Sequence, residues 1–216
     1  MERTRTMKIV DLSMTIQPHW RWKTKRVLAK DLAAGDPYQV SVMTIQAHAF
    51  THMDTPLHVM PDQITADEVP VDRLAGTAAV LDLTHVQANE KIGAETLKAA
   101  GAHIEPEDIV LLKTGWDLKY EYTSHEYWLN APYLDEEAAQ WLAEKDIKAV
   151  GFDFPQDHDI RKNPVPPPSH LPTHHLILTK GIYLIEYLCN VHEIEAERVN
   201  FFACLLYTSP SPRDRS

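Results

Sequence analysis

Cysteine and long apolar runs are both scarce in this chain. Only two of its 216 residues are cysteine, too few for a disulfide framework, which favours a reducing compartment. No apolar run approaches the roughly 20 residues that a helix needs to span a bilayer. The short charged start, residues 1–6, is not followed by an apolar segment of signal-peptide character. We therefore expect a cytoplasmic protein without a membrane role.

Positive charge is also in short supply. The chain has 21 basic and 31 acidic residues and a formal net charge of −10. Nucleic-acid binding usually needs a concentrated basic face, so this balance argues against such a partner. The one basic cluster, at residues 21–26 beside two tryptophans, is interpreted as a solvated surface segment. No G-x-S-x-G motif is present, which argues against a serine hydrolase, and Cys189 sits among apolar neighbours that indicate packing rather than nucleophilic chemistry.

Strand and helix signals alternate along the chain. Apolar runs and period-2 alternation predict strands, whereas capping residues and helical periodicity predict helices. The expected strands are 9–16, 38–46, 77–83, 109–114, 147–154, 182–188 and one starting at 200; the expected helices are 93–100, 135–145 and 173–180; and 164–172 is a proline-rich extended loop. Without an internal repeat or a dividing linker, this order predicts one mixed α/β domain.

The C-terminal segment differs in character from everything before it. Residues 204–214 read CLLYTSPSPRD, which matches the translation of a common sequencing adapter. We expect residues 7–203 to form the native domain and residues 204–216 to be read-through, so that the strand from residue 200 is cut short. The composition also fits a disordered tail rich in proline and serine.

Histidine and carboxylate residues concentrate directly after the second predicted strand. His48, His52, Asp54 and His58 fall within eleven residues. Imidazole together with carboxylate suits Zn²⁺, Mn²⁺ or Fe²⁺. A helical turn would put His48 and His52 on one face, and an extended segment would present His52 and Asp54 together. The spacing predicts part of a metal site, with further ligands supplied from elsewhere in the chain.

A second segment can supply those ligands. His174 and His175 precede Glu186, which lies in an otherwise apolar predicted strand. A carboxylate on a buried strand is costly unless it meets a cation. A metal ion would serve, and a buried ion pair with Lys180 or an arginine is the alternative.

These two segments resemble the signatures of the cyclase-type metal-dependent hydrolases, the family of bacterial kynurenine formamidase and isatin hydrolase. The first signature, H-x-G-T-H-x-D-x-P-x-H, fits residues 48–58 at every position but one, because Phe50 stands where the signature has Gly. The second, a His-His dyad followed by Gly and Glu, fits residues 174–186. Shorter matches at residues 11–13, 115–116 and 151–157 extend the resemblance over residues 7–203.

The resemblance implies a swivelling β/β/α fold, a homodimer, and about two Zn²⁺ per chain, with Mn²⁺ possible. It also implies roles for single residues. His48, His52 and Asp54 would bind one metal, with Asp54 reaching a second, and His174 and Glu186 would complete the pair. His58 would be the general acid/base, although it could instead be a metal ligand. Trp20 would face the substrate ring, with Trp22 equally near in sequence.

The implied function is hydrolysis of the C–N amide bond of an aryl formamide or a cyclic aryl amide. Three alternatives stay open: a relative that acts on a different amide or a lactone, a catalytically silent metal-binding relative in which Phe50 blocks the pocket, and an α/β binding domain whose histidines do not converge. Convergence of the candidate ligands in space separates the last alternative from the others.

Overall fold

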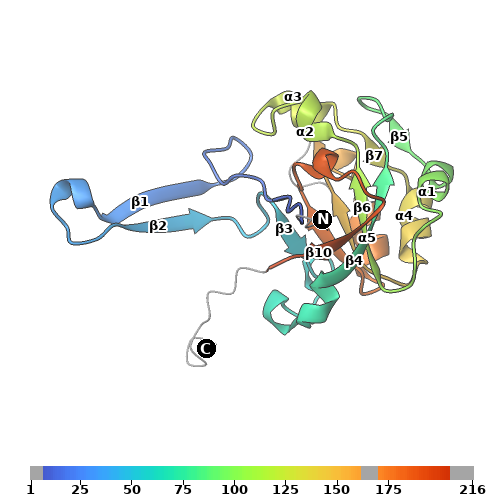
Figure 1. Ribbon diagram of the computed structural model, residues 1–216, viewed down its shortest axis with the longest axis horizontal. Helices are drawn as coiled ribbons and strands as arrows, with labels where there is room; N and C mark the ends of the chain where they lie inside the picture. Colours follow the sequence, from blue (N-terminus) through green and yellow to red (C-terminus); the bar gives the residue numbers. More distant parts are fainter. Residues whose placement is uncertain (1–6, 162–169, 205–216) are drawn as a thin grey trace, which may run out of the picture.

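A computed structural model describes residues 7–161 and 170–204. Its centre is a six-stranded mixed sheet with the strand order β10-β4-β6-β8-β9-β3 (Figure 1). The inner strands β4 (Ala75–Asp82), β6 (Asp108–Lys113), β8 (Ile147–Phe152) and β9 (Tyr183–Glu186) run parallel to one another. The two edge strands, β10 (Arg198–Phe202) and β3 (His52–Asp54), are antiparallel to their neighbours.

Helices follow the parallel strands, as crossover connections require. They are α1 (Ala94–Ala100), α2 (Trp116–Lys119), α3 (His125–Leu129), α4 (Glu136–Ala143) and α5 (Pro172–Leu178). Helices α1, α4 and α5 lie beside the sheet (Figure 1), and their buried residues join alternate strand residues such as Val110 and Leu112 in one core cluster. The intervening residues Ile109 and Leu111 pack on the other face of the sheet, in a second cluster. The short strands β5 (Lys91–Ile92) and β7 (Tyr133–Leu134) pair separately.

A two-stranded hairpin extends away from this body (Figure 1). Strand β1 (Thr24–Lys30) pairs antiparallel with β2 (Val40–Ile45), and almost every residue of the two strands is exposed. We call residues 23–45 the arm. Three residues of the basic cluster, Lys23, Lys25 and Arg26, are exposed as expected. Arg21 is instead half-buried: it donates a hydrogen bond to the Ile160 carbonyl and lies over the Trp128 ring.

The structure confirms one mixed α/β domain, and most predicted elements lie within a few residues of the observed ones. The strand predicted at residues 9–16 is wrong, because this stretch forms no ladder in the structure. The strand expected from residue 200 is β10, which begins at Arg198 and pairs with β4. Most of the predicted loop at 164–172 and nearly all of the segment 204–216 lie outside the described residues. Within the described part of the chain, no helix has the length and apolar character needed to cross a bilayer.

Candidate metal centre

Strand β3 carries two candidate ligands at the edge of the sheet. Its pairing with β9 places His52 opposite Glu186 and Asp54 opposite Leu184. Directly opposed residues of an antiparallel pair project from the same face, and residues two apart on one strand do so too. His52, Asp54 and Glu186 are therefore side by side, and both carboxylates are buried, with Asp54 5% and Glu186 0% exposed. The three-residue strand had no sequence signal of its own, because its pairing with β9 determines it.

His48 reaches the same face from a bend rather than from a helical turn. Residues 47–50 form bends before β3, and Phe50 has a positive φ of 57°. The His48 Nδ1 atom lies 3.3 Å from Asp54 Oδ1, and its Nε2 atom lies 3.6 Å from Glu186 Oε2. The His48 and His52 rings also meet edge-on, with His52 Nε2 2.7 Å from His48 Nδ1.

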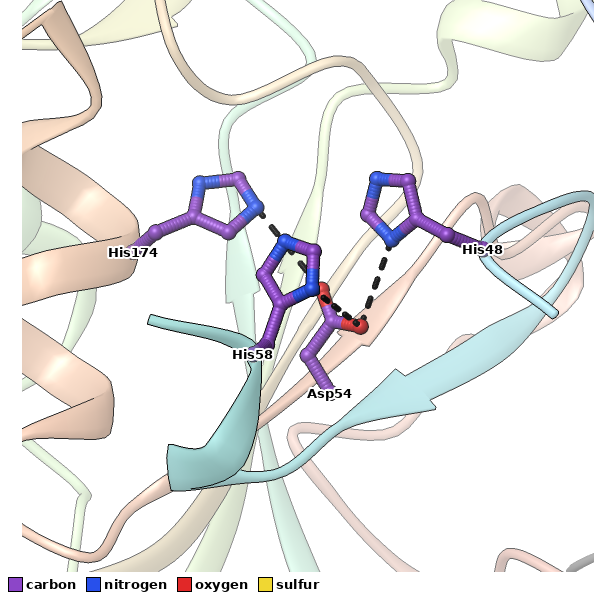
Figure 2. Close-up of side chains that lie close together, drawn as sticks. All are labelled: His48, Asp54, His58 and His174. Atoms are coloured by element: carbon purple, nitrogen blue, oxygen red, sulfur yellow. Dashed lines mark hydrogen bonds and ion pairs between the residues drawn. The ribbon is translucent and has the colours of Figure 1, made fainter. Parts of the chain in front are cut away.

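His58 and His174 approach from two further elements (Figure 2). A 3-10 helix at Pro56–His58, begun by the proline, turns the chain back so that His58 Nδ1 lies 3.9 Å from Asp54 Oδ1. Helix α5 presents His174 from its first turn. The His174 Nε2 atom lies 2.9 Å from Glu186 Oε1 and 3.7 Å from Asp54 Oδ2.

The structure thus brings all the sequence-predicted ligands together, and the alternative in which they do not converge is excluded. The cluster contains two overlapping groups, and within each group the candidate ligand atoms all lie within 4.8 Å of one another. One group is His48, Asp54, His58 and His174, and the other is His48, His52, Asp54 and Glu186. Lys180 is exposed, and Glu186 faces imidazoles instead, so the lysine ion pair considered for this glutamate is not formed.

Two buried oxygen atoms test whether a cation fits this cluster. Asp54 Oδ2 and Glu186 Oε2 are solvent-inaccessible and have no hydrogen-bond partner among the described residues. Buried carboxylate oxygens without a partner are costly, and a divalent cation would satisfy both. Mixed nitrogen and oxygen donors are the ligands that zinc and manganese accept. The donor set and the unpartnered oxygens therefore fit a metal ion.

The cluster shifts the pKa values of its members. Burial opposes ionisation of Glu186, but His174 and His48 outweigh it and lower the pKa of Glu186 to about 2. Burial likewise opposes a charged His52, yet Asp54 and Glu186 raise its pKa to about 8. The pKa of His58 is lowered, mainly by burial. The buried carboxylates thus stay ionised and attract positive charge, which protons supply unless a metal ion replaces them.

Groups behind the ligands fix their orientation, and the ligand predictions did not include them. Asp157 Oδ2 lies 2.5 Å from His174 Nδ1, which leaves His174 Nε2 directed at the cluster. The carbonyl oxygen of Phe50 lies 2.8 Å from His52 Nδ1 in the same way. Gln156 donates a hydrogen bond to Glu186. Polar residues just beyond the end of β8 were the available signal, because the carboxyl ends of parallel strands commonly border ligand sites.

The predicted substrate-facing residue, Trp20, lies outside the ligand cluster. Its ring stacks on His125 of α3 at 4.0 Å between centroids, and the residue is 46% exposed. Trp22 is buried and lies closer to the cluster, since its ring contacts Phe50 at 4.8 Å and Tyr187 at 5.3 Å. A role for Trp20 in binding substrate stays a prediction.

A parallel-centred α/β sheet with a histidine–carboxylate cluster at its β3 edge defines a class of candidate metalloproteins. Within that class the chain belongs to the cyclase family, since the family model described as "putative cyclase" matches residues 10–157.

Among sequence relatives, a kynurenine formamidase of Erythrobacter litoralis (strain HTCC2594) is 29% identical over 153 residues, which cover 68% of this chain and 66% of that protein. One of Bordetella petrii is 26% identical over 200 residues, covering 91% and 84%. The match to a Bacillus cereus kynurenine formamidase spans 63% of that protein. This chain therefore spans about two thirds of the length of the first relatives.

Solved structures support the same fold. Isatin hydrolase A from Labrenzia aggregata superimposes with a TM-score of 0.72 at 19% identity, covering 88% of this chain and 83% of that one. A predicted metal-dependent hydrolase from Bacillus stearothermophilus gives a TM-score of 0.65 at 26% identity, covering 89% and 87%. These likenesses agree with the mixed α/β architecture.

Proposed function

We propose that this chain is a metal-dependent hydrolase that cleaves the C–N amide bond of an aryl formamide or a cyclic aryl amide. The observation that carries the proposal is the convergence of the two histidine–carboxylate groups, with the unpartnered oxygens Asp54 Oδ2 and Glu186 Oε2 between them. Both groups contain Asp54, whose carboxylate has two oxygens and can therefore contact two ions. The names of the relatives support the substrate class.

The proposed role of each residue follows from its place in the cluster. His48, His52, Asp54, His174 and Glu186 would hold the metal ions, zinc or manganese. A bound ion of this kind polarises a carbonyl and lowers the pKa of water toward neutrality. His58 is at the exposed side of the cluster, with its side chain 33% accessible. Because its pKa is lowered, it is largely neutral at pH 7, so it can take up a proton and pass it to the leaving nitrogen.

We also propose that the chain acts as a homodimer on a small aromatic amide. The support for assembly is the arm, whose apolar side chains Val27, Val42 and Met43 are exposed in the part of the chain that the structure describes. The support for an aromatic substrate is the ring of Trp20, which is 46% exposed and stacks on His125.

Metal stoichiometry tests the proposal first. We expect elemental analysis of the purified, zinc-reconstituted chain to give about two equivalents. The Asp54→Asn variant, which keeps the side-chain shape but removes a charged ligand, should lose most of this metal. The Asp117→Asn variant is the matched control, because Asp117 also faces a histidine, His192 at 3.4 Å, away from the cluster. It should retain the wild-type content.

Substrate assays then separate the activity from the metal site. Loaded wild-type protein should hydrolyse N-formylkynurenine or isatin faster than aliphatic amides or lactones. A chain that holds metal but hydrolyses none of these would be a silent relative. A chain that takes up neither zinc nor manganese would contradict the whole proposal.

A further inference from the structure

Phe50 adopts a backbone conformation that residues other than glycine rarely take. Its φ is 57°, in the left-handed region. Contact between Cβ and the following carbonyl oxygen disfavours this region for L-residues, and glycine avoids that contact. Phe50 stands where the resembled signature has Gly. The bend before β3 has therefore kept a glycine-like geometry with a bulky residue, and some other contact must hold it there.

The ring of Phe50 supplies that contact. The residue is only 1% exposed, and its ring lies 4.8 Å from Trp22 and edge-on to His19 at 6.0 Å. Trp22 in turn contacts Trp128 at 5.3 Å and Tyr187 at 5.3 Å. Tyr187 directly follows the candidate ligand Glu186. The ring thus joins the bend before β3 to the segment before the arm, and Trp22 extends this packing to Tyr187, just after β9. The Phe50 ring neither turns outward nor is open to solvent.

The same residue contacts a candidate ligand through its backbone. The Phe50 carbonyl oxygen lies 2.8 Å from His52 Nδ1. A carbonyl only accepts hydrogen bonds, so His52 Nδ1 carries the proton and His52 Nε2 is directed at the cluster. There Nε2 lies 3.4 Å from Asp54 Oδ1 and 3.5 Å from Glu186 Oε2. The direction of this carbonyl depends on the left-handed conformation of residue 50.

We propose that Phe50 is a positioning residue for the metal centre. Its buried ring locks the bend in the left-handed conformation, and its carbonyl oxygen thereby holds His52 with Nε2 toward the ion. This inference rests on the proposed metal site and goes beyond it. The signature has glycine at this position, and the inference assigns to Phe50 the task of keeping the bend in the left-handed conformation. Ring and carbonyl act together, so loss of the ring should weaken metal binding without removing any ligand.

Zinc affinity in matched variants tests this role. Phe50→Leu removes the ring but keeps a side chain at the left-handed position. Phe201→Leu makes the same change in the opposite core cluster, where Phe201 is 6% exposed on β10. Competition with a chromophoric chelator would give the zinc affinity of each full-length chain, and thermal unfolding would report its stability. We expect Phe50→Leu to lower the zinc affinity about tenfold, as altered outer-shell contacts do. Phe201→Leu should lower the melting temperature with unchanged affinity.

Phe50→Gly removes the ring while allowing the left-handed backbone without strain. Glycine takes the left-handed conformation freely but cannot lock it, so this variant should also bind zinc more weakly than wild type. Wild-type affinity in either Phe50 variant would overturn the inference, as would an equal loss of affinity in Phe201→Leu. These outcomes differ from failure of the proposed function, in which the wild-type chain itself binds no zinc.

Discussion

His58 and His52 share one cluster but differ in their surroundings. His52 lies between two carboxylates, so its pKa is raised to about 8 although burial acts against this. His58 is at the rim, and its pKa is lowered by burial and by the neighbouring imidazoles despite Asp54. Position alone thus gives the two histidines opposite pKa shifts, in line with the different roles proposed for them.

Replacing His58 with glutamine should abolish proton transfer and leave metal binding intact. Glutamine keeps a polar side chain but does not titrate, and loss of a general acid/base typically lowers kcat by about 100-fold or more. Steady-state kinetics and elemental analysis on the same preparation would measure both properties. His85→Gln, at an exposed position outside the cluster, is the control. A parallel loss of zinc in His58→Gln would make His58 a ligand instead.

The pKa of His52 predicts how stability depends on pH in the metal-free chain. The folded value of about 8 lies above the ordinary 6.5, so the folded state holds this proton more tightly than the unfolded state. The resulting stabilisation, about 2 kcal/mol, is fully present below pH 6.5 and is lost as the pH rises through 8. Urea unfolding in EDTA between pH 6 and 9 would reveal it, and His52→Gln should flatten the decline. An identical decline in that variant would contradict the assignment.

At the scale of elements, the sequence predicted what local chemistry determines. Helix α4 was found because Asp135 caps it, accepting a hydrogen bond from the Ala138 amide. The buried strands β6 and β8 were found because both of their faces are apolar. Strand β3 was missed, and the segment 9–16 was wrongly predicted to be a strand, because strand pairing depends on a partner distant in sequence. The alternation in 9–16 meets no neighbouring strand, whereas β3 pairs with β9 despite its polar residues.

Asp157 contacts both the first turn of helix α5 and His174, the candidate metal ligand that this helix carries. Asp157 accepts a hydrogen bond from the Thr173 amide at 2.9 Å and contacts His174 Nδ1. Asp157→Asn should lower zinc affinity about 10- to 100-fold, the usual effect of losing such a partner. Asp135→Asn makes the same change at the cap of α4, where asparagine caps about as well, and should bind zinc normally. Equal affinities in isothermal titration of the two variants would contradict this role for Asp157.

The convergence of the candidate ligands was predictable from the sequence, whereas the residues that position them were not. The spacing of His48, His52 and Asp54 and the polar Glu186 in an apolar strand are visible in one sequence, because ligand chemistry restricts residue type. The contacts of Phe50 and Trp22 were not visible, since aromatic residues are equally common in cores. The candidate ligands can therefore be identified from the sequence, whereas the contacts that position them can be identified only from the structure.

The arm is the feature of the whole molecule that the single chain leaves unexplained. Isolated two-stranded hairpins are at best marginally stable in water, yet this one exposes Val27 (43%), Val42 (51%) and Met43 (48%). Between residues 23 and 30 it carries only basic charges, in a chain with a net charge of −10. Apolar area and opposite charge both favour docking of the arm on the acidic body of a second copy.

Light scattering after size exclusion should accordingly give twice the 24.6 kDa of one chain. Val27 and Val42 are directly paired across the arm, so the double variant Val27→Thr/Val42→Thr removes apolar area from one face while keeping good strand formers. It should shift the population toward monomer, and high salt should weaken the wild-type dimer by screening the charges. Val71→Thr, at a 70% exposed valine outside the arm, should stay dimeric. A wild-type chain that remains monomeric at about 50 μM, well above a micromolar dissociation constant, would contradict dimerisation through the arm.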